Sequence, residues 1–239
     1  MDYHQEIIMH KDIRKSSQRG FVDHGWLKTY HTFSFGEYYD PHFMGFRTLR
    51  VINEDQIKGA QGFPTHSHDN MEILTLLLEG ELVHKDSMGN GSVIHAGEAQ
   101  LMSAGSGVTH SEFNHSATKD AHLLQIWILP DTKGLTPGYQ QKQLSLQPNQ
   151  WVLVASKQGL HGSLRIHQDA EVSLAQLETG HSLDRMLKEE RYGWLHIISG
   201  TVNCDGVALQ KGDAMAMEGK KHFHLTATSS AKILFFDLN

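Results

Sequence analysis

A repeated pattern of short apolar segments and glycines constrains the fold of this chain more than any other feature. The stretch LTLLLEGELVHKDSMGNGSVIHAGEAQLM reads as strand, glycine, strand, turn, strand, glycine with an acidic residue, and strand. The later stretch LHIISGTVNCDGVALQKGDAMAM has the same order, although Gly80 and Gly97 are 17 apart and Gly200 and Gly212 only 12. Short strands separated by glycine-containing turns are typical of antiparallel sandwiches and barrels. The repeat therefore predicts an all-β protein with two antiparallel β-barrels related by duplication.

A change in pattern near the middle of the chain predicts the boundary between the barrels. Residues 131–148, DTKGLTPGYQQKQLSLQP, carry two of the five prolines and interrupt the strand rhythm. We expect an N-terminal barrel over residues 1–132, a linker over 133–148 and a C-terminal barrel over 149–239. Helical patterns are scarce, and the best of them predicts a short helix around residues 183–190.

The composition disfavours several classes of function. The net charge is −6 and the chain has no run of Lys or Arg, whereas direct nucleic-acid binding needs a basic stripe. The single cysteine, Cys204, rules out an intramolecular disulfide and fits a reducing compartment. The N-terminus lacks the apolar core of a signal peptide, and no stretch approaches the ~20 apolar residues that span a bilayer. We therefore expect a cytoplasmic protein that binds neither nucleic acid nor membrane.

Two short motifs predict a metal site in the N-terminal barrel. Side chains alternate along a strand, so His66 and His68 share a face, and Glu72 joins them if the strand is unbroken. His110 and Glu112 are also two apart. With 18 histidines among 239 residues, one His-x-His motif alone is weak evidence. The glycine-bounded hairpin between the two motifs gives them a reason to converge. Imidazole suits Fe, Ni, Cu and Zn, and a carboxylate disfavours soft metals.

Longer motifs carry a family resemblance. GAQGFPTHSHDNMEILTLLLEG resembles the first motif of the cupin superfamily, and GEAQLMSAGSGVTHSEFN resembles the second. More narrowly, the chain resembles the pirin family and its short bacterial members, through the segments HGWLKTYHTFSFGEYYDP, FMGFRTLRVIN, HSHDNMEILTLLLEGE, HKDSMGN, LMSAGSGVTHSEFN and LLQIWILP. The resemblance spans essentially the whole chain, closely over 24–130. It implies a bicupin fold, with two jelly-roll barrels packed face to face and one metal in the N-terminal barrel.

The resemblance also implies the metal ligands, which are His66, His68, His110 and Glu112. Many other cupins use the glutamate of the first motif, here Glu72, but the pirin pattern takes its carboxylate from the second motif. We therefore expect Glu72 to orient a ligand histidine, as carboxylates close to metal sites commonly do.

The C-terminal barrel lacks matching ligands. Transferring the ligand offsets from the first pair of glycines to the second gives Met186, Lys188, Leu225 and Ala227. These side chains do not form a comparable site, so the second barrel is expected to be degenerate and without metal. His222 and His224 lie nearby but out of register, and a second metal site there is the alternative.

The activity that the resemblance implies is that of a quercetin 2,3-dioxygenase, in which O2 opens the heterocyclic ring of a flavonol with loss of CO. The flavonol 3-hydroxyl would bind one divalent transition metal, and Glu112, or alternatively Glu72, would take its proton as general base. Fe(II) is the expected metal, and Ni, Mn, Cu and Zn are alternatives. The expected partners are a small flavonol-like aromatic substrate and O2, and the chain is expected to be a monomer. His24 and His31 either border the pocket or are hydrogen-bonded structural histidines.

Two other functions use the same residues. Some pirin relatives act as transcription cofactors, which implies a metal-binding regulatory module with a protein partner. A Zn cupin isomerase that acts on sugars is the third alternative. Loss of quercetin absorbance in air separates the dioxygenase from both, and a content of Zn alone would favour the isomerase.

Overall fold

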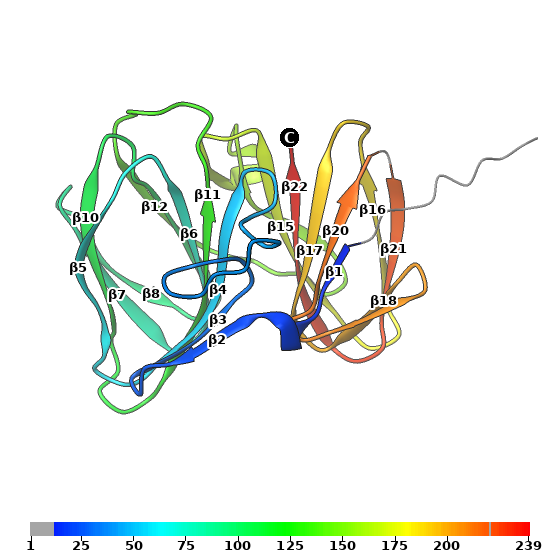
Figure 1. Cartoon of the computed structure of the whole chain (residues 1–239), viewed down its shortest axis with the longest axis horizontal. Helices are drawn as coiled ribbons and strands as arrows, with labels where there is room; N and C mark the ends of the chain where they lie inside the picture. The colour runs from blue at the N-terminus through cyan, green and yellow to red at the C-terminus, as the bar shows by residue number, and fades with distance from the viewer. Residues whose placement is uncertain (1–11, 220) are drawn as a thin grey trace, which may run out of the picture.

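Two β-barrels lie side by side in the computed structural model, which describes residues 12–219 and 221–239 (Figure 1). Two 3₁₀ helices, Ser16–Gln18 and Leu160–Gly162, are the only helical elements of the described part. Neither they nor any other described segment forms a helix whose length and hydropathy would let it cross a bilayer. The predicted all-β architecture of two antiparallel barrels is confirmed.

The first barrel combines a seven-stranded sheet with a four-stranded sheet. Their strand orders are β12-β9-β6-β11-β4-β3-β2 and β5-β10-β7-β8. The strands are β2 Gly20–Asp23, β3 Leu27–His31, β4 Leu49–Ile57, β5 Gly62–His68, β6 Glu72–Glu79, β7 Glu81–Asp86, β8 Gly91–His95, β9 Glu98–Ser103, β10 Val108–Asn114, β11 Ala121–Ile128 and β12 Gly138–Gln143.

The second barrel repeats this arrangement. Its sheets have the orders β1-β20-β17-β22-β15-β13-β14 and β16-β21-β18-β19. Its strands are β1 Asp12–Arg14, β13 Trp151–Ser156, β14 Leu164–Arg165, β15 Ala170–Leu177, β16 Ser182–Leu187, β17 Tyr192–Ser199, β18 Thr201–Cys204, β19 Val207–Gln210, β20 Ala214–Glu218, β21 Lys221–Ala227 and β22 Ala231–Leu238. The series β9-β6-β11-β4-β3 thus corresponds to β20-β17-β22-β15-β13, as expected for a duplicated unit.

The main apolar core lies between the two large sheets and joins the barrels. Leu74 and Ile126 of the first sheet belong to the same buried cluster as Leu174 and Phe236 of the second. Strands covered on both faces read as continuous apolar runs rather than alternating ones. This explains the segment EILTLLLE, in which the first six residues are all buried.

The interiors of the two barrels differ. The second is filled by one large apolar cluster that includes Met215, Phe223 and Phe235. The first holds two small apolar clusters, and buried polar side chains such as Gln100 and Glu112 lie in its interior. Only a barrel that is not filled by large apolar side chains can admit a ligand. The first barrel is therefore the candidate for a ligand site.

The predicted linker over residues 133–148 is wrong in part, because it contains β12. This strand pairs with β9 along its whole length, from Gly138 opposite Ser103 to Gln143 opposite Glu98. The Gln141 side chain also donates to the backbone carbonyl of Val93. The prolines flank the strand instead of interrupting it. The predicted N-terminal barrel, residues 1–132, therefore omits its last strand, β12. Residues 1–11 of that predicted barrel lie outside the described part.

The predicted helix around residues 183–190 is wrong as well. Residues Ser182–Leu187 form β16, which pairs with β21 from Ser182 opposite Thr226 to Leu187 opposite Lys221. Exposure alternates along this strand, with period 2 instead of 3.6, because one face packs on the barrel and the other meets solvent. Tertiary packing therefore overrides a weak local helical preference.

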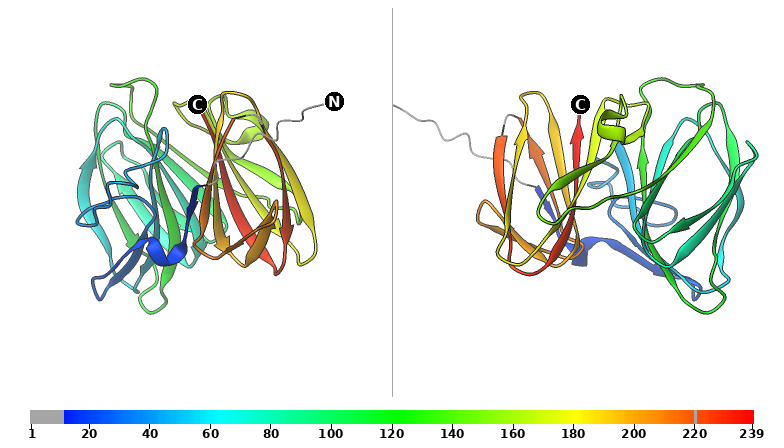
Figure 2. Two further views of the ribbon diagram at one scale, coloured as in Figure 1. Left: turned by 45° about the vertical axis from the view of Figure 1, so that its right-hand side comes forward. Right: turned by 180° about the vertical axis from the view of Figure 1, so that it is seen from behind.

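The first described strand belongs to the second barrel. β1 pairs with β20, with Ile13 opposite Met215, and the chain then passes beneath the molecule to β2 (Figure 2). The buried Arg14 side chain donates to the Tyr38 hydroxyl at 2.7 Å and to Asp40 at 3.2 Å. The start of the chain therefore ties the two barrels together, a feature that the sequence patterns did not predict.

Candidate metal centre and adjoining cavity

Pairing between β5 and β10 brings the two predicted motifs together. His110 lies opposite His66, and Val108 lies opposite His68. Burial alternates along β10, so His110 and Glu112 both point into the barrel. The register then shifts between these two residues. The local sequence explains the close approach of the strands, because a Cβ atom at Gly62 would lie 2.2 Å from the backbone oxygen of Glu112.

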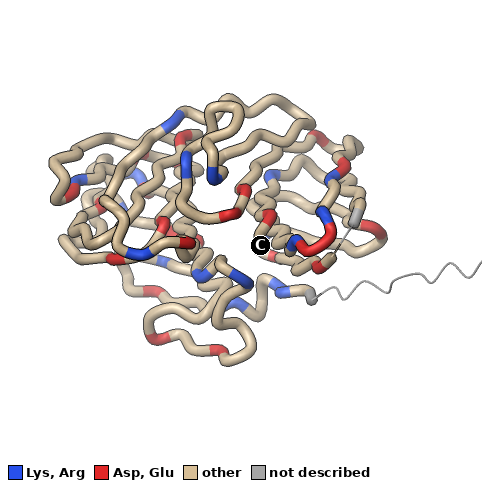
Figure 3. Tube along the Cα trace, turned by 90° about the horizontal axis from the view of Figure 1, so that it is seen from above, with Lys and Arg blue, Asp and Glu red and all other residues tan. Residues whose placement is uncertain are grey.

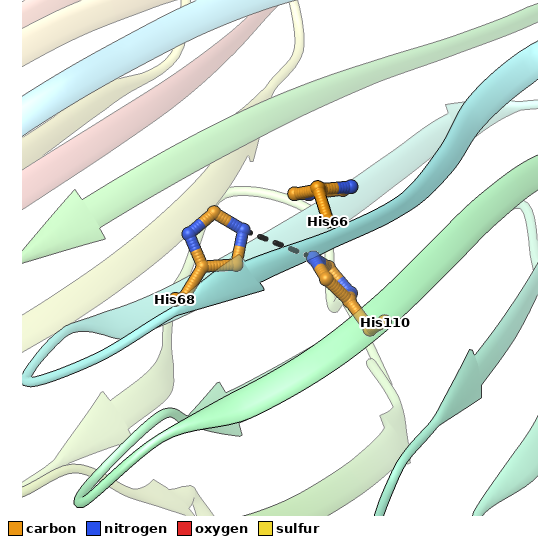
Figure 4. Close-up of side chains that lie close together, drawn as sticks. All are labelled: His66, His68 and His110. Atoms are coloured by element: carbon orange, nitrogen blue, oxygen red, sulfur yellow. Dashed lines mark hydrogen bonds between the residues drawn. The ribbon is translucent and has the colours of Figure 1, made fainter.

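Three of the predicted ligands converge at one point (Figure 4). His66, His68 and His110 each offer a ring nitrogen, and these nitrogens all lie within 4.8 Å of one another. The Nε2 atoms of His68 and His110 are 3.1 Å apart. His66 donates from Nδ1 to the backbone oxygen of Pro64 at 2.8 Å, because a carbonyl can only accept. The Nε2 atom of neutral His66 therefore carries a lone pair, as a metal ligand requires.

The electrostatics of the cluster suit a cation. Burial, together with the neighbouring histidines, lowers the pKa of His68 to about 4 and that of His110 to about 3. Both rings are therefore neutral near pH 7. Two neutral imidazoles whose nitrogens lie 3.1 Å apart need a shared proton or a shared cation between them. The donor set thus fits a divalent transition metal, for which neutral imidazole is the commonest ligand.

A buried pair behind His110, which sequence reasoning missed, orients this ring. The Nε2 atom of His84 lies 3.0 Å from Asp86, and its Nδ1 atom lies 3.5 Å from Nδ1 of His110. Hydrogen bonds from His84 and Asn90 lower the pKa of Asp86, although burial alone would raise it. An ionised Asp86 accepts a hydrogen bond from Nε2 of His84. His84 then accepts from Nδ1 of His110 and leaves the Nε2 lone pair of His110 free. The sequence HKD at residues 84–86 was the available signal, because alternation along a strand places His84 and Asp86 on one face.

Glu112 is buried beside the histidines and is held by two amides. Its carboxylate accepts hydrogen bonds from Gln100 at 2.7 Å and from Gln125 at 2.8 Å. With His84 and His110 it forms a second group whose ligand atoms lie within 4.8 Å of one another. It therefore adjoins the three-histidine group through His110, and sequence reasoning missed the two glutamines that position it.

Glu72 lies elsewhere, and the expectation that it orients a ligand histidine or acts as base is not supported by its position. Its carboxylate accepts from Ser103 at 2.8 Å and faces His167 of the second half at 3.3 Å. The strand is not continuous, because β5 ends at His68 and β6 begins at Glu72. The intervening turn also removes the condition under which Glu72 would share a face with His66 and His68.

A cavity of about 580 Å³ opens beside this cluster and is lined by His66 and His68. Aromatic rings form much of its wall, namely Trp26, Phe35, Phe63 and Trp127. Trp127 makes edge contacts with His68 at 5.0 Å and with Phe35 at 5.3 Å between ring centroids. His24 and His31 both line this cavity. His31 is also hydrogen-bonded, since its Nδ1 atom lies 2.8 Å from the Asn53 side-chain oxygen, so both alternatives for this residue hold.

One buried carboxyl in the cavity wall was not singled out by sequence reasoning. Asp55 lines the cavity and is only 3% exposed. Burial raises its pKa to about 7, and the negative charges of Glu112 and Glu54 act in the same direction. The alternating segment RTLRVINEDQI placed this residue on a strand, yet nothing in the pattern showed that its face of the strand borders a cavity.

The alternative metal position in the second barrel lies on its outer surface. His222 and His224 are exposed and lie 3.2 and 3.1 Å from the same oxygen of Asp184. Their neighbours Phe223 and Leu225 point into the filled apolar interior instead. Lys, Arg, Asp and Glu are interspersed over both barrels, and the described residues show no stripe of one sign (Figure 3).

Comparisons with known proteins cover both halves of the chain. A family model described as Pirin matches residues 12–128, and one described as Quercetinase C-terminal cupin domain matches residues 153–238. A protein named quercetin 2,3-dioxygenase from Escherichia coli (strain K12) is 45% identical over 227 residues, which are 95% of this chain and 97% of that protein. The crystal structure of YhhW from Escherichia coli is 44% identical with a TM-score of 0.93, covering 96% of this chain and 97% of that one. A crystal structure of bacterial pirin YhhW in complex with nickel(II) is also 44% identical, with a TM-score of 0.92, covering 95% and 98%.

Proposed function

Because the chain belongs to the pirin family of bicupin proteins, we propose that it is a metal-dependent dioxygenase that uses O2 to open the heterocyclic ring of a flavonol such as quercetin. The observation that carries the proposal is the convergence of three imidazoles beside an aromatic-lined cavity. The 45% identity to a protein named quercetin 2,3-dioxygenase supports the choice of substrate class.

The size and lining of the cavity support a flat aromatic substrate. Its volume of about 580 Å³ lies within the range of about 300–1,000 Å³ that small-molecule sites occupy. Aromatic rings such as Trp127 and Phe35 can pack against the faces and edges of a flavonol. The same rings would exclude bulk water from the reacting end of the substrate.

The proposed metal ligands are His66, His68, His110 and Glu112. Neutral imidazoles with a neighbouring carboxylate fit Fe(II), which we favour, and the nickel complex of YhhW supports Ni(II) as an alternative to Mn, Cu or Zn. When bound, such a metal would supply Lewis acidity for the flavonol 3-hydroxyl. Gln100 and Gln125 would hold the Glu112 carboxylate in place.

The proposed reaction consumes one flavonol and one O2. The products are carbon monoxide and a ring-opened ester that bears a new carboxylic acid, so both atoms of O2 remain in the products. The chain contributes the ligand geometry, the dry aromatic wall and a group that moves the 3-hydroxyl proton.

Aerobic incubation with quercetin tests the proposal. Metal-loaded wild-type protein should remove the absorbance of quercetin and release CO. His66→Ala should lose at least about 100-fold in kcat/KM because the metal site is incomplete. His95→Ala is the matched control, since this histidine is exposed on β8. Wild-type protein that carries Fe or Ni and leaves quercetin unchanged would contradict the proposal and favour a regulatory module, and a purified protein with Zn alone would favour an isomerase.

A further inference from the structure

Three buried carboxylates of the first barrel, on Glu112, Glu72 and Glu54, are held by protein partners. Glu112 accepts from two glutamine amides, and Glu72 accepts from Ser103 at the boundary of the barrels. Glu54 accepts from Arg19 at 3.0 Å and lies 3.3 Å from Lys211. Each of these three carboxylates is therefore already committed to protein partners.

Asp55 differs from all three. Its Oδ1 atom is buried and makes no well-aligned hydrogen bond among the described residues, although the Thr29 hydroxyl opposite it on β3 acts on it as a donor. Buried polar atoms in folded proteins almost always have a partner, and leaving one unpaired is unfavourable. Because Asp55 also lines the cavity, a ligand in the cavity is the natural partner for this carboxyl.

The position of Asp55 on β4 places it on the same wall as the polar cavity residues. Its register neighbours are Thr29 on β3 and Leu123 on β11. Asn53, two residues earlier on the same face, lies opposite His31 and Gln125. Gln125 in turn holds Glu112, so this wall adjoins the metal centre.

From this geometry we propose that Asp55 is the catalytic base that takes the proton from the flavonol 3-hydroxyl, which assigns the role to neither Glu112 nor Glu72. The inference rests on the proposed dioxygenase function. In this step the O–H bond of the substrate breaks and the proton goes to the Asp55 carboxylate. The electron pair stays on the substrate oxygen. After ring opening, Asp55 returns the proton to the new carboxylate of the product, so the residue is regenerated.

The charges around Asp55 match this role. Burial and the like charges of Glu112 and Glu54 raise its pKa to about 7, while the Thr29 hydroxyl and His122 act in the opposite direction. A base whose pKa lies near the working pH is the most effective proton acceptor.

Anaerobic binding spectra test the proposal without relying on turnover. Flavonols absorb at longer wavelength as anions than as neutral molecules. Nickel-loaded wild-type protein at pH 7 should shift the band of bound quercetin to the red. Asp55→Asn should bind nickel and quercetin but leave the neutral band in place, and kcat in air should fall by about 10²–10⁴-fold with little change in KM. Asp23→Asn, which removes an exposed charge from β2 of the same sheet, should behave as wild type.

The outcomes separate this proposal from the proposed function. An active wild type and an Asp55→Asn variant with the same red-shifted band and the same kcat would overturn the role of Asp55 alone. A metal-loaded wild type that neither binds nor consumes quercetin would overturn both. If Asp55→Asn fails to fold, infrared difference spectra of the wild type decide the matter. Anaerobic quercetin should produce the carbonyl stretch of a newly protonated carboxyl, and its absence would refute the proposal.

Discussion

The role of a histidine in this molecule depends on the face of the strand that carries it. His66 and His68 on β5 have the same spacing as His222 and His224 on β21. The first pair converges with His110 beside a cavity, whereas the second pair lies on the outside of a filled barrel. Spacing shows that two side chains share a face but does not show what that face meets. The convergence of His66 and His68 with His110 was therefore predictable only because a second motif accompanied the first.

Asp55 gives a prediction for the pH dependence of stability in the metal-free protein. Its pKa is raised from an ordinary 3.8 to about 7, so the folded state holds this proton more tightly than the unfolded state. The wild type therefore loses stability as the pH rises from about 4 to about 7. Asp55→Asn has no such proton. Its free energy of unfolding should therefore rise relative to that of the wild type over this interval, by on the order of 3–4 kcal/mol at pH 8.

Urea unfolding at pH 4, 6 and 8 measures this difference. Asp23→Asn is the control and should show no comparable trend, because that carboxyl is exposed. If the difference in free energy of unfolding between Asp55→Asn and the wild type is the same at all three pH values, the pKa of Asp55 is not raised in the folded protein.

At the scale of elements, the pairing of β5 with β10 determines whether the proposed ligands meet. Alternation correctly predicted that His110 and Glu112 share a face. For Glu72 the alternation required an unbroken strand, and a turn separates β5 from β6. The shift of register between His110 and Glu112 was also not predictable, since it depends on contacts with a strand distant in sequence. Regular strands could thus be predicted from the sequence, whereas turns and bulges that redirect them could not.

Gly62→Ala should separate these two strands. The new Cβ atom would lie 2.2 Å from the backbone oxygen of Glu112 and 2.5 Å from Cα of Phe113, so β5 must move away from β10. We expect nickel affinity to fall by roughly 10–100-fold and stability to fall by about 1–3 kcal/mol, as overpacking typically does.

Calorimetric nickel titration and denaturant unfolding provide the two measurements. Gly91→Ala is the matched control, because a Cβ atom at this position on β8 meets no atom within 4 Å. Wild-type nickel affinity in Gly62→Ala would mean that the close approach of the strands does not position the ligands.

At the scale of the whole molecule, the two barrels share both a core and an ion-pair network, so we expect them to unfold as one body. The sequence repeat predicted the duplication, but it did not show that β12 completes the first barrel or that β1 pairs in the second. Glu54 on β4 carries part of the connection. It accepts from Arg19 and His122 and pairs with Lys211 of the second barrel.

Glu54→Gln should destabilise both barrels together. Its charged partners lower the pKa of Glu54 despite burial, so its contribution is present above the unfolded value of about 4.5 and is lost as the pH falls below it. We expect the free energy of unfolding to fall by about 2–4 kcal/mol at pH 7 and by less at pH 4.

Far-UV circular dichroism and tryptophan fluorescence should report one coincident transition for the wild type and for this variant. The exposed Glu79→Gln provides the control. Two separated transitions in the wild type would show that the barrels unfold independently.

The pairing of β1 with β20 has a consequence for how the chain is made. Arg14 pairs with Ala214, so the partner strand emerges from the ribosome about 200 residues later. At about 5–20 residues per second, the segment waits roughly 10–40 s for its place in the sheet. Strand β1 therefore has no partner in its sheet until β20 has been synthesised, so this sheet of the second barrel cannot include it before then.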